Sequence, residues 1–170
     1  MRAFLALDIP PPIQHAIERW RDRQVVAAGR AVPAANFHIT LHFLGDITPR
    51  QLERLCLDAG RIRAQRFDLV LDQPGYFPRP GIFWLGPGQV PGALTDLAAA
   101  LRRVGRKAGI AAPRKPFQPH LTLFRNCRAR PPLPTGNPDF HLPCDGFTLF
   151  QSVTGHKGVR YQPLHRWAAE

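Results

Sequence analysis

Two short segments of this chain place a histidine two residues before a threonine inside an apolar run. His38 and Thr40 lie in HITLHFLGD, and His120 and Thr122 lie in HLTLFRN. Residues two apart on a β-strand point to the same face, so each segment would present one imidazole beside one hydroxyl group. The intervening apolar residues would face the core. The pattern therefore predicts two strands that each carry a histidine and a threonine side by side.

These two side-chain types suit chemistry at phosphorus. Imidazole exchanges a proton near neutral pH because its ordinary pKa is about 6.5. A threonine hydroxyl can donate a hydrogen bond to a non-bridging phosphate oxygen. If both strands face one phosphorus atom, the threonines hold two oxygens and the histidines stand on opposite sides. One imidazole then deprotonates the attacking group and the other protonates the leaving oxygen, which predicts in-line displacement without a metal ion.

The residues alone leave other interpretations open. A single histidine-x-threonine occurs by chance, and a histidine on a strand is often structural. A zinc hydrolase that uses His38, His42 and His120 is a further alternative, although no carboxylate or cysteine motif accompanies these residues. The recurrence of the whole pattern in two apolar segments favours catalysis over coincidence.

The charge of the chain favours a polyanionic partner. It has 23 lysine and arginine residues against 12 acidic ones, for a formal net charge of +11. Such a surface attracts phosphates and speeds their encounter with the protein.

Composition also excludes several classes of protein. No apolar run is long enough to span a bilayer, and the N-terminal segment lacks the pattern of a secretory signal. The 3 cysteines are widely spaced, which argues against a disulfide framework and against a structural zinc site. We therefore expect a cytoplasmic protein without membrane contact.

Hydrophobic periodicity predicts a mixed α and β chain. Helices are expected at 11–28, 48–64 and 92–109, and strands at 2–9, 37–44, 67–77, 81–86, 119–125, 147–153 and 160–167. Pro163 would restrict the last strand to an edge or a bulge.

The expected strands also suggest an internal duplication. After the first motif, strand-like segments begin at residues 67 and 82; after the second motif, they begin at 147 and 161. Two small α+β lobes, each presenting one motif, would then face a shared cleft.

The segments NFHITLHFLGD and FQPHLTLFR resemble the two signatures of the two-histidine (2H) phosphoesterases. They are most similar to those of the LigT-like RNA 2',3'-cyclic phosphodiesterases, once named 2'-5' RNA ligases. RAFLALDIP, GYFPRPGIFWLG and YQPLHRW also resemble that bacterial subgroup, so the similarity covers almost the whole chain.

The resemblance implies an α+β, bilobal fold with two antiparallel sheets and flanking helices, related by pseudo-twofold symmetry around a central cleft. It implies that residues 1–170 form a single domain of two small interleaved lobes, which we expect to be a monomer. The implied enzyme is a hydrolase that needs no cofactor and opens RNA or nucleoside 2',3'-cyclic phosphate ends to 2'-phosphomonoesters. Reversible 2'-5' ligation of RNA ends, including tRNA halves, is implied as well. The alternative function is a non-catalytic module that binds RNA ends.

The family motif also assigns roles to residues. His38 and His120 match the acid and base, with His120 expected to activate water and His38 to protonate the departing 3'-oxygen, while Thr40 and Thr122 match the phosphate-binding threonines. Arg125 matches a basic position that contacts phosphate.

Strand parity complicates three further positions. Arg125 and Phe43 each follow their histidine by five residues and should point to the opposite face. A role for Arg125 therefore requires a bulge, twist or strand end that re-aims it. Core packing is the first expectation for Phe43, and stacking on a nucleobase is the second. His42 should share the face of His38, at a position where similar proteins usually carry lysine.

Overall fold

The computed structural model describes residues 1–170, which form an α+β fold. The elements in chain order are β1 (Arg2–Asp8), α1 (Pro11–Gln24), β2 (Arg30–Ala31), the 3-10 helix η1 (Ala34–Asn36), β3 (His38–Asp46), α2 (Pro49–Ala59), β4 (Phe67–Phe77), β5 (Ile82–Pro87), α3 (Gly92–Lys107), β6 (Leu121–Arg125), β7 (Phe140–Cys144), β8 (Gly146–Gly155) and β9 (Gly158–Ala168). No helix has the length and apolar character needed to cross a bilayer.

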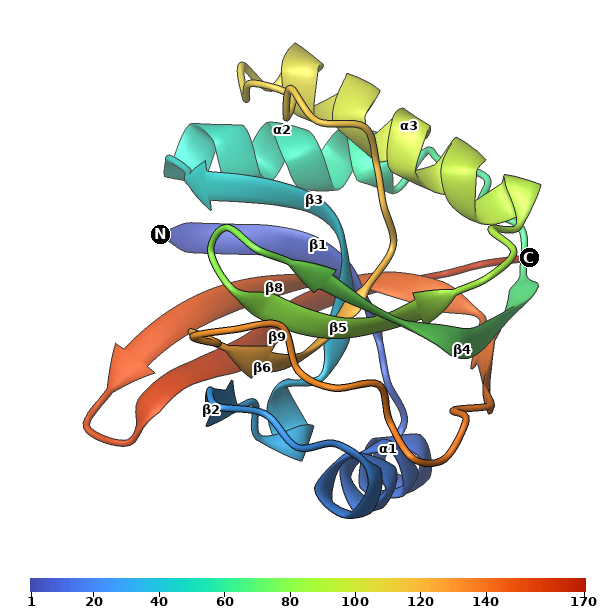
Figure 1. Cartoon of the computed structure of the whole chain (residues 1–170). Coiled ribbons are helices and arrows are strands. Elements are labelled where there is room, and N and C mark those ends of the chain that lie inside the picture. The colour runs from blue at the N-terminus through green and yellow to red at the C-terminus, as the bar shows by residue number, and fades with distance from the viewer.

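The strands form two antiparallel halves that meet at the two motif strands. The sheet order is β7-β4-β5-β6-β3-β1-β8-β9, with β2 paired to the last two residues of β6 (Figure 1). β6 and β3 share one residue pair, Ile39 with Leu121, whereas strands within each half pair over several residues. The two antiparallel sheets expected from the sequence are therefore present as two halves joined at one point.

Each half of the sheet contains strands from both parts of the chain. β4 and β5 follow the first motif in the chain but lie in the half that contains β6. β8 and β9 follow the second motif but lie beside β1 in the half that contains β3. Each half thus presents one motif strand, but its other long strands come largely from the chain segment that follows the other motif.

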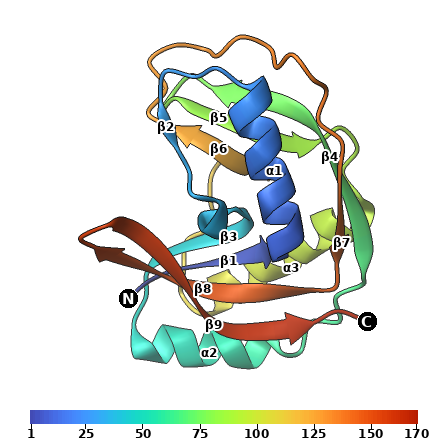
Figure 2. The same ribbon diagram turned by 90° about the horizontal axis from the view of Figure 1, so that it is seen from below.

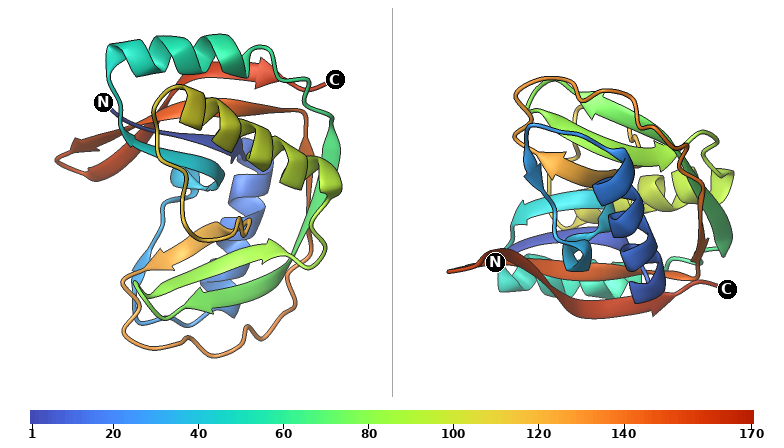
Figure 3. Two further views of the ribbon diagram at one scale, coloured as in Figure 1. Left: turned by 90° about the horizontal axis from the view of Figure 1, so that it is seen from above. Right: turned by 60° about the horizontal axis from the view of Figure 1, so that its bottom comes forward.

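The helices cover the strands from two sides. α2 and α3 lie above the strands in the view of Figure 1, and α1 lies below them (Figures 2 and 3). Thr48 begins α2 with a capping box: its hydroxyl accepts from the backbone N–H of Gln51, and the Gln51 side chain accepts from the backbone N–H of Thr48. A single cluster of 34 buried residues, drawn from both halves, forms the core.

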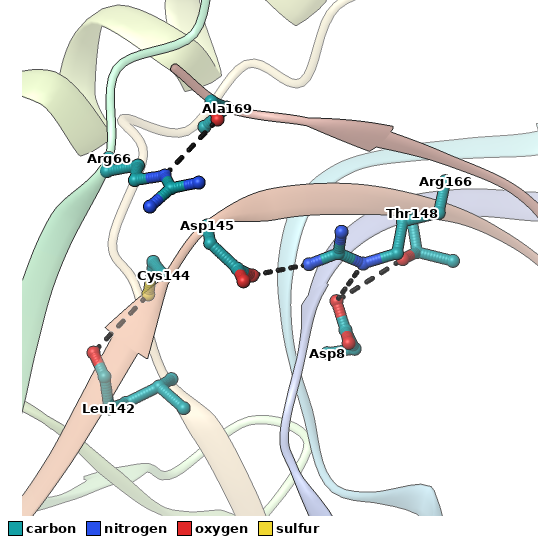
Figure 4. Close-up of polar contacts among 8 residues, drawn as sticks. All are labelled: Asp8, Arg66, Leu142, Cys144, Asp145, Thr148, Arg166 and Ala169. Carbon is teal, nitrogen blue, oxygen red and sulfur yellow. Dashed lines mark hydrogen bonds and ion pairs between the residues drawn. The ribbon is translucent and has the colours of Figure 1, made fainter.

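The C-terminal strand is fixed by a polar network (Figure 4). Arg166 on β9 forms ion pairs with Asp145 and Asp8, and the Thr148 hydroxyl donates to the Asp8 carboxylate. β9 is an edge strand, and Pro163 lies at a register shift against β8, as expected from its missing N–H.

The expected elements are present, with some boundaries moved. α1 ends at Gln24 rather than 28, because Val25 is already extended. β7 was not expected from the sequence: it has only five residues, includes Pro143, and is stabilised by pairing with β4 at the sheet edge.

Candidate functional site

The register of β3 and β6 brings the two motifs together. Ile39 pairs with Leu121 in antiparallel orientation, so His38 lies across from Thr122, and Thr40 lies across from His120. Ile39 and Leu121 are both fully buried. Their sequence neighbours therefore point to the opposite face, where all four side chains are partly exposed. This face is the centre of the candidate active site.

Both imidazole rings are held in the same way. The Nδ1–H of His38 donates to the carbonyl oxygen of Asn36 at 2.8 Å, and that of His120 donates to the carbonyl oxygen of Gln118 at 2.8 Å. A carbonyl can only accept, so the proton of each neutral ring must be on Nδ1. In both rings Nε2 is left as the nitrogen that can exchange a proton with a ligand.

Matched bulges in the motif strands decide where the next side chains point. On β3, Thr40 pairs with Ala6 and His42 with Leu5, so Leu41 has no partner on β1. On β6, Thr122 pairs with Trp84 and Phe124 with Phe83, so Leu123 has no partner on β5. Each extra residue lies three positions after the histidine. After this residue, side chains that would face the core in a regular strand face the site, and those that would face the site turn to the core.

The bulges resolve the parity of Arg125 and Phe43. Arg125, five residues after His120, is brought back to the face of the site, and its positive charge contributes to lowering the pKa of both His38 and His120. Phe43 is equivalent to it on β3: its side chain is 46% exposed and lines the pocket beside the site. The expectation of core packing for Phe43 is therefore wrong, because it assumed a regular strand.

The same bulge removes His42 from the site. Its ring is 1% exposed, both ring nitrogens lack a hydrogen-bond partner, and it packs against Gly105 of α3. A Cβ at residue 105 would lie 2.6 Å from Nε2 of His42, so glycine is needed there. The prediction that His42 shares the face of His38 is wrong. His38 and His120 therefore do not form a zinc-binding triad with His42. No group of three or more potential metal ligands gathers anywhere in the chain.

The surroundings of His42 make the stability of the fold dependent on pH. Burial, with the charges of Arg102 and Arg106, lowers the pKa of His42 from 6.5 to about 4. The unfolded chain therefore binds more protons as the pH falls below 6.5, and the free energy of unfolding decreases until about pH 4. We expect this group to contribute about 3 kcal/mol to that loss.

Urea unfolding at pH 7.5 and 4.5 tests this expectation. His42→Leu removes the titrating ring, so its free energy of unfolding should decrease less on acidification than that of the unmodified protein. The lowered pKa values of His38 and His120 also reduce the free energy of unfolding on acidification, so the variant should keep part of the pH dependence. An unchanged pH dependence in the variant would contradict the assignment.

Burial also governs the protonation of the two catalytic candidates. It lowers the pKa of His38 to about 4; the hydrogen bond to Asn36 opposes this, and the charges of Arg125 and His120 add to it. Burial lowers the pKa of His120 as well, opposed by its bond to Gln118 and reinforced by Arg125. The charge of His120 therefore disfavours protonation of His38.

Aromatic rings enclose each imidazole. Phe4 and Tyr161 lie 4.8 and 5.0 Å from the ring of His38, measured between centroids. Phe77 and Trp84 lie 5.1 and 6.0 Å from the ring of His120. Sequence reasoning did not identify these four residues, because they come from four different strands and meet the histidines only through the sheet register.

A pocket of about 870 Å³ opens beside His120 and Thr40. Its aromatic walls include Phe43, Phe77 and Phe117, and its cations are Arg79, Arg102 and Lys115. Flat rings next to fixed positive charges suit a nucleobase attached to phosphate groups.

A buried arginine that sequence reasoning missed connects β6 to the segment that precedes β3. Arg21 of α1 is 4% exposed, and its guanidinium donates to the carbonyl oxygens of Val32 and of the bulged Leu123. It also lies 5.4 Å from the ring of Phe37 and 5.5 Å from that of Phe124, which directly precede His38 and Arg125. The only available signal was an arginine at a core position of an amphipathic helix.

Comparison with known proteins agrees with this arrangement. The family model for LigT like Phosphoesterase matches the chain twice, over residues 7–84 and 85–161, so each match contains one histidine-x-threonine motif. The chain is 38% identical to the RNA 2',3'-cyclic phosphodiesterase of Escherichia coli (strain K12), over 98% of this chain and 96% of that protein. It is 31% identical to the enzyme of the same name from Thermus thermophilus, over 99% and 90% of the two chains.

Solved structures match equally well. The crystal structure of E. coli LigT complexed with 3'-AMP superposes with a TM-score of 0.91 at 38% identity, covering 99% of this chain and 97% of that one. The two matches to the family model, the full-length sequence identity and the shared fold lead to one conclusion: the chain belongs to the LigT-like phosphoesterase family.

Proposed function

We propose that the protein hydrolyses the 2',3'-cyclic phosphate of RNA or nucleoside ends to a 2'-phosphomonoester. The observation that carries the proposal is the register of β3 and β6, which places two imidazoles and two hydroxyls on one face around a single point. The relatives named RNA 2',3'-cyclic phosphodiesterase support the choice of substrate.

The reaction needs one base and one acid on opposite sides of phosphorus. A water molecule attacks the phosphorus and gives a proton to Nε2 of one neutral imidazole. The bond between phosphorus and the 3'-oxygen breaks, and that oxygen takes the proton from Nε2 of the second, charged imidazole. Thr40, Thr122 and Arg125 hold the non-bridging oxygens as negative charge develops on them.

The electrostatics of the site favour one assignment of these roles. Burial and the charges of Arg125 and His120 hold the pKa of His38 at about 4, so this ring is neutral near pH 7 and able to accept a proton. We therefore assign His38 as the base and His120 as the acid. This is the reverse of the assignment expected from the family motif.

The pocket beside His120 would receive the nucleoside that carries the cyclic phosphate. Phe43 lies on its wall with an exposed ring, which suits stacking on the base. The proposal extends to reversible ligation, in which an RNA 5'-hydroxyl replaces water as the attacking group, the same bond to the 3'-oxygen breaks and a 2'-5' linkage forms, with tRNA halves as candidate substrates.

We further propose that the chain acts as one domain of two interleaved lobes and as a cytoplasmic monomer. The single core cluster with residues from both halves supports the first statement, and the three free cysteines are in keeping with a reducing compartment.

One assay tests the proposed activity. The protein is incubated with 2',3'-cyclic AMP in excess EDTA, and the products are separated by chromatography. We expect 2'-AMP to accumulate at the same rate with and without EDTA. A 3'-AMP product would contradict the assignment of the leaving oxygen. Binding of 2',3'-cyclic AMP without turnover would indicate the alternative, a module that only holds RNA ends.

A further inference from the structure

A second arginine lies directly beside Arg125. β2 lies beside β6 (Figure 2) and pairs with it in antiparallel orientation, and Arg30 is the cross-strand partner of Arg125. Directly opposed residues on antiparallel strands point to the same face, with Cβ atoms about 5 Å apart. Because Arg125 faces the site, Arg30 extends the positive surface from the site toward the edge of the sheet.

No acidic group neutralises this pair. The ion pairs formed by arginines in this chain involve Arg21, Arg54, Arg61 and Arg166. Like charges directly opposite each other destabilise a strand pair. Two arginines that are directly opposed on paired strands and have no acidic partner suit an anion, because an anion would relieve the repulsion between their charges.

The backbone around Arg30 is held in place on both sides. The N–H of Val32 donates to the carbonyl oxygen of Leu123 at 2.9 Å, and the N–H of Arg128 donates to the carbonyl oxygen of Ala28 at 3.1 Å. Gly29 fits so closely that a Cβ there would lie 2.8 Å from the carbonyl oxygen of Arg125. The segment that carries Arg30 is thus a fixed strand at the edge of the site.

We propose that Arg30, next to Arg125, binds a second phosphate of the substrate: the 5'-phosphate of the nucleotide that carries the cyclic phosphate. In an RNA chain this is the phosphodiester that joins the terminal nucleotide to its neighbour. Arg125 contacts the reacting phosphate and Arg30 the next one along the chain. The inference rests on the proposed function, and it makes an RNA end a better substrate than a nucleoside cyclic phosphate.

Two substrates that differ by one phosphate test it: adenosine 2',3'-cyclic phosphate with and without a 5'-phosphate. We expect the 5'-phosphate to raise kcat/KM of the unmodified protein about tenfold, and Arg30→Ala to abolish that gain while hydrolysing the plain substrate normally. Arg103→Ala is the charge-matched control, because Arg103 is exposed on α3 beside a separate hollow with Arg63. Equal losses on both substrates in Arg30→Ala would overturn the proposal.

Calorimetric binding separates this inference from the proposed function. Adenosine 2',5'-bisphosphate should bind about tenfold more tightly than 2'-AMP, and Arg30→Ala should bind the two equally. If the protein turns over neither cyclic substrate but shows this difference, the proposed function fails and the second phosphate site stands. If the gain in affinity is absent from the unmodified protein, or persists in Arg30→Ala, the second site is wrong whatever the activity.

Discussion

Replacing His38 or His120 by alanine is expected to slow the opening of 2',3'-cyclic AMP by about 10²- to 10⁴-fold. Each ring supplies a proton transfer that water performs poorly, and each has its Nδ1 committed to a backbone carbonyl. The double variant should be little slower than either single one, because base and acid act in the same step. Rates of 2'-AMP formation under single-turnover conditions measure these effects.

A change of leaving group should distinguish the two rings. In a cyclic phosphate with sulfur in place of the bridging 3'-oxygen, the thiolate leaves without being protonated. The variant that lacks the acid should then recover most of its rate, whereas the one that lacks the base should not. We expect recovery in His120→Ala. Recovery in His38→Ala would restore the assignment expected from the motif. If either variant hydrolysed 2',3'-cyclic AMP at the original rate, the paired mechanism would be contradicted.

Replacing Arg21 by methionine is expected to lower the free energy of unfolding by about 3 kcal/mol. The substitution keeps a long apolar stem but leaves the buried carbonyl oxygens of Val32 and Leu123 without their charged donor. The contacts to Phe37 and Phe124 are lost too. Since these residues adjoin His38 and Arg125, kcat/KM should also decrease in the fraction that remains folded.

Arg19→Met is the matched control, because Arg19 is exposed on the same helix. Urea unfolding of both variants gives the comparison. Arg21→Lys should recover only part of the loss, since an ammonium group cannot reach two carbonyls and lie against two rings as a planar guanidinium does. Equal stability of Arg21→Met and Arg19→Met would show that the guanidinium does not stabilise the contact between β6 and the segment that precedes β3.

The elements of the fold and the centre of the site could be predicted from the sequence because both depend on local periodicity. The apolar residues at 39 and 121 required the neighbouring histidines and threonines to share the other face, and the structure has them there. The placement of each histidine beside its threonine used only residues within three positions of one another, whereas the shared cleft was expected from the repeated spacing of the strands and from the family resemblance.

The remaining features depend on partners that are distant along the chain. A bulge forms when two strands of unequal residue count pair, so Leu41 and Leu123 look like ordinary strand residues until β1 and β5 lie beside them. For this reason His42 and Phe43 were placed on the wrong faces. Arg30, in a two-residue strand without apolar alternation, gave no signal at all.

The exchange of strands between the halves constrains how such a site could have arisen. A polypeptide equal to one repeat would carry a motif but would lack most of the other strands of its half, because β4 and β5 support the second motif while β8 and β9 lie in the half of the first. Two copies of that shorter polypeptide would have had to exchange strands so that each motif strand lay in a complete half. The present chain has the architecture of such a symmetric dimer, fused end to end, with its axis passing between Ile39 and Leu121.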